Sequence, residues 1–127
     1  MMTFGTLIRI PDGKRRIIEL SETRLKEILT FVASHIVVDA DWYLEFYRDV
    51  QEAIRRGESS SAKDHYTKYG YFEDRMPRAF KVDAKWYLSE YPDVADAIRS
   101  GLVESPQHHF ERDGFKEGRR AHRDWVL

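Results

Sequence analysis

At 127 residues the chain can form one modest domain, which leaves no room for a two-domain enzyme. Its 21 basic and 22 acidic side chains nearly cancel, so no overall field would attract DNA or an anionic membrane. The lack of cysteine excludes disulfides and thiolate metal sites. Because there is no signal-peptide pattern and no apolar run of roughly 18 residues, we expect a folded cytoplasmic protein, although a piece of a larger secreted chain would have the same features.

The first segment, residues 1–37, predicts a β-hairpin followed by a helix. Pro11-Asp12-Gly13 suits a tight turn between two apolar stretches. Ser21 suits the N-cap of a helix, after which apolar residues recur at helical spacing. Because an isolated hairpin is marginal in water, we expect it either to pack on this helix or to pair its edge with a second copy of the protein. The apolar helix positions are Leu25, Ile28, Leu29, Val32 and Ile36, and the candidate dimerisation residues are Phe4, Ile8, Ile10, Ile18, Leu25 and Ile28.

Residues 38–81 and 82–127 are two tandem copies of one repeat. The segment from Val38 aligns without a gap on the segment from Val82, at a constant offset of 44 residues, and about half of the aligned positions are identical. Chance does not produce such agreement over a stretch of this length. The identical pairs include Trp42/Trp86, Tyr43/Tyr87, Asp49/Asp93, His65/His109 and Arg75/Arg119.

Each copy predicts three short helices. Capping residues mark their starts and glycines mark their ends. The expected boundaries are Asp39 and Asp83 (first helix starts), Gly57 and Gly101 (second helix ends), Ser61 and Ser105 (third helix starts), and Gly70 and Gly114 (third helix ends). Helices this short are unstable alone, so we expect a mainly α fold in which the two repeats pack as one domain. A platform for a ligand is the weaker alternative for the aromatics expected in the core, which are Trp42, Trp86, Tyr43, Tyr87, Tyr66 and Phe110.

The five histidines do not match the spacing of a known catalytic or metal site. His65 and His109 are equivalent by the repeat, which favours one structural role, such as a hydrogen bond to a carbonyl in the same copy. A metal site at His108 and His122 is the weaker alternative. No phosphate loop, His-Glu-x-x-His or nucleophile elbow is present in the sequence, so we expect no enzyme activity, no cofactor and no metal.

Residues shared by both copies are those that the fold needs twice, so specificity is expected where the copies differ. Arg75 and Arg119, in matching sequences, predict a repeated ion pair or carbonyl contact that stabilises little if exposed. The candidate partner-binding residues are Phe46, Arg48, Tyr69 and Phe72 in the first copy and Glu90, Asp113 and Lys116 in the second.

The copies resemble a bacterial tandem repeat of the form YLxxNPDVxxA(V/I)xxG followed by SxxxH(Y/F)xxxGxxEGR. This repeat occurs in some RTX-type and surface-layer-like proteins and in some polysaccharide-biosynthesis proteins. The resemblance covers about two thirds of the chain. It implies a structural or interaction module and brings no catalytic residues. The matching residues are Tyr87, Leu88, Pro92, Asp93, Val94, Ala97, Ile98, Gly101, Ser105, His109, Phe110, Gly114, Glu117, Gly118 and Arg119.

The first copy departs from this form at two positions, with Arg48 in the proline place and Asp74 in a glycine place. In both copies a tyrosine, Tyr47 or Tyr91, replaces the asparagine of the form, which removes a side-chain cap.

The sequence favours a non-enzymatic adaptor that binds another protein, with homodimerisation through the N-terminal segment. Glycan binding is the first alternative, because the repeat is rich in aromatics and resembles modules found in polysaccharide-biosynthesis proteins. Transcriptional regulation through basic clusters such as Lys14-Arg15-Arg16 is the second alternative, and the acidic residues close to these clusters argue against nucleic acid.

Overall fold

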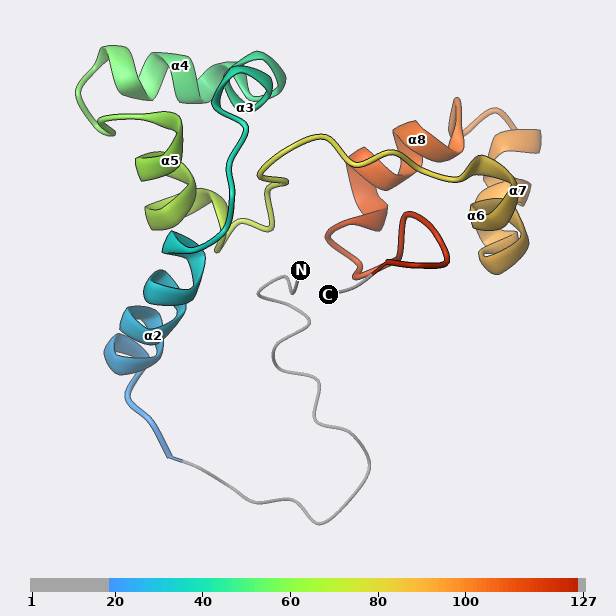
Figure 1. The fold of residues 1–127 in the computed structure, drawn as a ribbon. Coiled ribbons are helices and arrows are strands. Elements are labelled where there is room, and N and C mark those ends of the chain that lie inside the picture. The colour runs from blue at the N-terminus through green and yellow to red at the C-terminus, as the bar shows by residue number, and fades with distance from the viewer. Residues whose placement is uncertain (1–18, 126–127) are drawn as a thin grey trace. The chain divides into compact units, whose positions relative to one another are not determined.

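The computed structural model describes residues 19–125 (Figure 1). These residues form seven α-helices and two π-helical turns and contain no strand, so the mainly α class is confirmed. No helix in this range is long and apolar enough to cross a membrane. The predicted β-hairpin and four candidate dimerisation residues lie outside the described residues: Phe4, Ile8, Ile10 and Ile18.

The described chain divides into two compact units, one within residues 19–79 and the other within residues 80–125. Each unit therefore holds one copy of the repeat, and the first unit also holds the helix that precedes it. The packing of the two copies into one domain stays a prediction.

Helix α2 (Glu22–Ser34) begins where the sequence predicts, because the Ser21 hydroxyl accepts a hydrogen bond from the Arg24 amide at 3.1 Å. It contacts η1 (Tyr66–Gly70), the π-helical turn of the first copy. Only Leu29 and Ala33 are buried on α2. Of the other residues in the predicted apolar stripe, Leu25, Ile28 and Val32 are exposed, whereas Ile36 lies beyond the end of α2 and is half-buried.

The two copies have the same elements in the same order (Figure 1). The first copy contains α3 (Ala40–Phe46), α4 (Arg48–Arg55), α5 (Ala62–His65) and η1. The second copy contains α6 (Ala84–Glu90), α7 (Pro92–Arg99), α8 (Pro106–His109) and η2 (Phe110–Gly114). All four predicted N-caps are confirmed by hydrogen bonds of 3.0 to 3.1 Å, at Asp39, Asp83, Ser61 and Ser105. Gly57 and Gly101 adopt φ angles of 76° and 78°, which confirms the predicted helix ends.

The third helix of each copy differs from the continuous helix that the sequence predicts. It is a short α-helical piece followed by a π-helical turn, in which the Tyr71 amide donates to the Tyr66 carbonyl at 2.8 Å, five residues back. A Cβ atom at Gly70 would collide with the Tyr43 hydroxyl. The glycine that ends the turn therefore leaves room for a tyrosine from α3.

The core of each copy is aromatic. Four of the six aromatics expected in the core are at most 1 % exposed, namely Tyr43, Tyr66, Tyr87 and Phe110. Trp42 and Trp86 are only half-buried, so their assignment to the core was wrong. Successive residues on a helix point about 100° apart, so a tryptophan next to an inward-facing tyrosine turns toward the surface.

Backbone hydrogen bonds close each copy on itself. The Asp39 amide donates to the Pro77 carbonyl at 3.0 Å, and the Asp83 amide donates to the Ala121 carbonyl at 3.0 Å. The copies differ in what packs against their aromatic core. In the first unit α2 packs on η1, whereas in the second the Trp125 ring lies 5.8 Å from Phe110.

Candidate functional site

Arg75 and Arg119, which are equivalent in the two copies, each form a network of ion pairs with two acidic side chains. The Arg75 guanidinium donates two hydrogen bonds to Asp49, at 2.9 and 2.7 Å, and one to Glu73 at 2.6 Å. It also lies 4.9 Å from the centre of the Tyr47 ring. Arg119 makes the same set of contacts in the second copy. The predicted repeated ion pair is confirmed.

This network sets the ionisation of its members. The hydrogen bonds from Arg75 hold the pKa of Asp49 below its usual value, and Asp93 responds in the same way to Arg119. Because the same groups recur in both copies, the network belongs to the fold of the repeat rather than to a site present once.

The shared histidines bond to tyrosines rather than to carbonyls, so that detail of the prediction was wrong. The Tyr43 hydroxyl lies 3.0 Å from Nδ1 of His65, and the Tyr87 hydroxyl lies 2.9 Å from Nδ1 of His109. This ring nitrogen is the hydrogen-bond partner of each buried phenol among the described residues. A buried hydroxyl needs an acceptor, so we expect the phenol to donate and the histidine to carry its proton on Nε2. Burial lowers the pKa of both histidines and raises the pKa of both tyrosines.

The candidate residues of the first copy lie in two places. Phe46, at the end of α3, is 40 % exposed and stacks on Trp42 with ring centres 4.6 Å apart. Arg48 is exposed at the start of α4, two residues on. Tyr69, on η1, is exposed beside the His65 ring. The fourth candidate residue, Phe72, is half-buried.

The candidate residues of the second copy include two that form ion pairs. Glu90 accepts a hydrogen bond from Arg120 at 3.3 Å, and Asp113 pairs with Arg112 at 2.6 Å. Lys116 is exposed. Within the described residues no hydrogen bond or ion pair joins Glu90 to Asp113 or Lys116.

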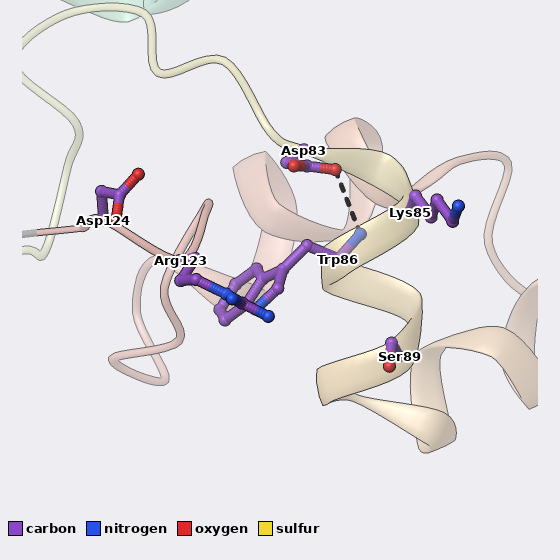
Figure 2. A pocket seen from close by; sticks show the side chains of 6 residues that line it. All are labelled: Asp83, Lys85, Trp86, Ser89, Arg123 and Asp124. Atoms are coloured by element: carbon purple, nitrogen blue, oxygen red, sulfur yellow. Dashed lines mark hydrogen bonds between the residues drawn. The ribbon is translucent and has the colours of Figure 1, made fainter.

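An open surface pocket of about 430 Å³ lies beside Trp86 in the second copy (Figure 2). The Asp83 carboxylate at its edge accepts a hydrogen bond from the Trp86 amide at 3.1 Å. The Arg120 guanidinium lies 5.1 Å from the centre of the Trp86 ring. The pocket is lined by Asp83, Lys85, Trp86, Ser89, Arg123 and Asp124.

Two cations of this pocket are not neutralised by a neighbour. Neither Lys85 nor Arg123 forms an ion pair with any residue of the described range, whereas Arg112, Arg119 and Arg120 in the same unit all do. Figure 2 shows Arg123 and Trp86 among the side chains that line the pocket. The pocket therefore combines a half-exposed aromatic surface with two cations that have no ion-pair partner among the described residues and with two carboxylates, Asp83 and Asp124.

The sequence indicated Trp86 only as a core residue with a ligand platform as the weaker alternative, and Arg123 only as part of a basic cluster, and it did not connect the two. The pocket combines residues 83–89 with residues 123–124, which no local pattern connects. A position-by-position comparison of the copies includes three of them among its differences, because Lys85, Ser89 and Arg123 differ from their first-copy equivalents. Those equivalents are Asp41, Glu45 and Ala79.

A smaller hollow lies in the first copy between α4 and η1. Its lining includes the imidazole of His65, the ring of Tyr69, and Ser59. The Ser59 hydroxyl is buried and has no hydrogen-bond partner among the described residues. Because this hydroxyl does not reach the surface of the hollow, it offers a ligand no ready contact.

The basic clusters that the structure describes are largely paired with acids. Arg55 and Arg56 contact Glu52 and Glu58. Arg119 and Arg120 are paired as described above, and Lys14-Arg15-Arg16 lies outside the described residues. Among residues 19–125 no group of three or more His, Asp or Glu side chains could hold a metal ion.

No family model, curated protein or solved structure matches this chain. The resemblance to the bacterial tandem repeat therefore stays a hypothesis carried by the motif residues alone.

Proposed function

We propose that the protein is a non-enzymatic interaction scaffold that self-associates through α2 and presents its repeats to another protein. The observation that carries this proposal is the exposed apolar surface of α2. Leu25, Ile28, Phe31 and Val32 are 37 to 68 % exposed, although α2 already buries Leu29 and Ala33 against its own unit.

The apolar surface of α2 is wider than the part that the other described residues of its unit cover. At about 100° per residue, the apolar positions of α2 span roughly 200° of the helix circumference, whereas a surface helix of a globular protein commonly has a stripe of about 100°. The buried residues occupy one side of this arc, and Ile28 and Phe31 occupy the other. Exposed contiguous apolar surface of this kind is typical of an interaction site.

The charges on α2 are compatible with a second copy of the same chain as the occupant. The helix carries two acids and two bases, Glu22, Glu27, Arg24 and Lys26, all in its N-terminal half. Their opposite signs cancel within the helix through ion pairs between Arg24 and Glu27 and between Lys26 and Glu22. Two such helices can therefore meet without a net repulsion, and the uncharged C-terminal halves supply the apolar contact.

The first copy supplies the surface for the other protein. Phe46 and Trp42 form a stacked aromatic pair, and the exposed Arg48 lies next to it in the chain. In the second copy Glu90 stands where the first has Phe46, so this apolar pair is present once. Aromatic and arginine side chains are the types enriched in the energetic centres of protein interfaces.

Hydrogen exchange measured at increasing protein concentration tests the self-association. The amides of α2 are expected to become more protected as concentration rises, while the amides of α7 stay unchanged. Protection in α2 that does not depend on concentration would contradict the proposal.

A further inference from the structure

We infer that the pocket beside Trp86 binds a carboxylated sugar. This site is separate from the α2 surface and does not depend on self-association. The inference rests on the lining of the pocket: a half-exposed indole, two unpaired cations and polar groups able to contact hydroxyls (Figure 2).

The aromatic part of the site is held in place before a ligand arrives. The amide of Trp86 donates to the Asp83 carboxylate, and Arg120 lies against the indole ring while it pairs with Glu90. Tyr91 packs edge-on to the same indole, with ring centres 6.2 Å apart. A tryptophan fixed in this way loses little conformational freedom on binding, and its ring can pack on the C–H face of a pyranose.

The charged groups select an anion with a single charge. Arg123 can donate two parallel hydrogen bonds to a carboxylate, and Lys85 adds a second cation. Asp83 and Asp124 lie at the same pocket, so a doubly charged phosphate would meet two carboxylates there. A carboxylate meets less repulsion, and a sugar that carries one also offers hydroxyls to Ser89 and Asp124.

The equivalent place in the first copy lacks this chemistry. Trp42 is present, but Asp41 and Glu45 replace Lys85 and Ser89, and no cation stands at the position of Arg123. At these positions the first copy therefore carries two acids in place of a cation and a serine, and acids repel a carboxylate. Each chain thus contains an internal control for the proposed site.

Nuclear magnetic resonance of the ¹⁵N-labelled full chain tests the inference, with glucuronate as the probe and glucose as its neutral counterpart. The chain has three tryptophans, so the indole N–H signals of Trp86 and Trp42 can be followed in one titration. We expect glucuronate to shift the Trp86 signal in a saturable way and to leave the Trp42 signal in place. We expect glucose to bind at least about fivefold more weakly, because it cannot use the two cations.

Two variants and one control complete the test. Arg123→Ala and Lys85→Asp, the second of which introduces the first-copy residue, are each expected to weaken glucuronate binding by about tenfold. Arg99→Ala removes an exposed arginine of α7 outside the pocket and is expected to have no effect. Thermal unfolding of each variant shows whether it remains folded, and both substituted side chains are exposed.

Three results would overturn the inference. These are the absence of any saturable shift with glucuronate, equal binding of glucuronate and glucose, and unchanged binding in both pocket variants. Equal shifts of Trp86 with an acidic peptide such as triglutamate would indicate a peptide site instead. None of these outcomes bears on the concentration dependence of α2 protection.

Discussion

The Tyr43 hydroxyl lies 3.0 Å from Nδ1 of His65, and both side chains are buried. The same bond joins Tyr87 to His109 in the second copy at 2.9 Å. Each bond links the first helix of its copy to the third across 22 residues of sequence. A buried phenol and a buried imidazole thus satisfy each other, and the pair serves as a stabilising unit of the repeat.

The two buried histidines predict that stability falls at acid pH. Burial holds their pKa below the ordinary value of 6.5, so below that value the unfolded chain takes up protons that the folded chain does not. Their contribution is therefore complete above pH 6.5 and is lost as pH falls through that value toward the folded pKa. Thermal unfolding measured between about pH 7.5 and 5 checks this, and the double variant His65→Gln, His109→Gln should show a smaller decrease. An equal decrease in the double variant would assign the acid sensitivity to other groups.

The glycine of the π-helical turn predicts a steric coupling with Tyr43. Gly70→Ala places a Cβ atom against the Tyr43 hydroxyl and is expected to cost about 2 kcal/mol of unfolding free energy. In a Tyr43→Phe background the obstructing hydroxyl is absent, so the same substitution should cost about 1 kcal/mol less. Chemical denaturation of the four proteins of this cycle measures the coupling. A cost that is the same in both backgrounds would show that the hydroxyl is not the obstacle.

The bidentate geometry of Arg75 predicts that lysine cannot replace it. Arg75→Lys keeps the charge but loses one of the two parallel bonds to Asp49 and the stacking on Tyr47. The expected loss of unfolding free energy is about 1 kcal/mol, a modest value because the Asp49 side chain is 62 % exposed. Arg99→Lys, in the exposed pair with Asp96, is the control and should change stability little. Equal losses in the two variants would mean that the geometry of Arg75 has no special value.

Local features of the fold could be predicted from the sequence because they depend on neighbouring residues. A side-chain oxygen at Asp39 or Ser61 caps the helix that starts at the next residue, and Gly57 ends a helix because it accepts a positive φ. The duplication added strength to these predictions, since each pattern occurs twice. The comparison of the two copies also predicted that Arg75 forms an ion pair. It did not identify the partner, Asp49, which lies 26 residues away.

Features that depend on distant segments could not be predicted in this way. The π-helical turn that ends at Gly70 packs against Tyr43 of α3. Trp42 is half-buried because its neighbour Tyr43 occupies the core-facing position. The width of the apolar arc on α2 was visible in the sequence, but which part of it η1 covers was not. The Trp86 pocket was missed because the C-terminal segment that brings Arg123 to it lies about 40 residues further along the chain.

The most direct test of the scaffold proposal is the mass of the full chain in solution, measured by light scattering at protein concentrations up to about 0.2 mM. The account predicts a dimer that the double variant Ile28→Glu, Phe31→Glu converts to a monomer that still unfolds in one cooperative thermal transition, because both side chains are exposed among the described residues of one chain. Leu102→Glu, which alters an exposed leucine of the second copy, should remain dimeric. A wild-type chain that is monomeric over the whole range, or a double variant that stays dimeric, would contradict the account.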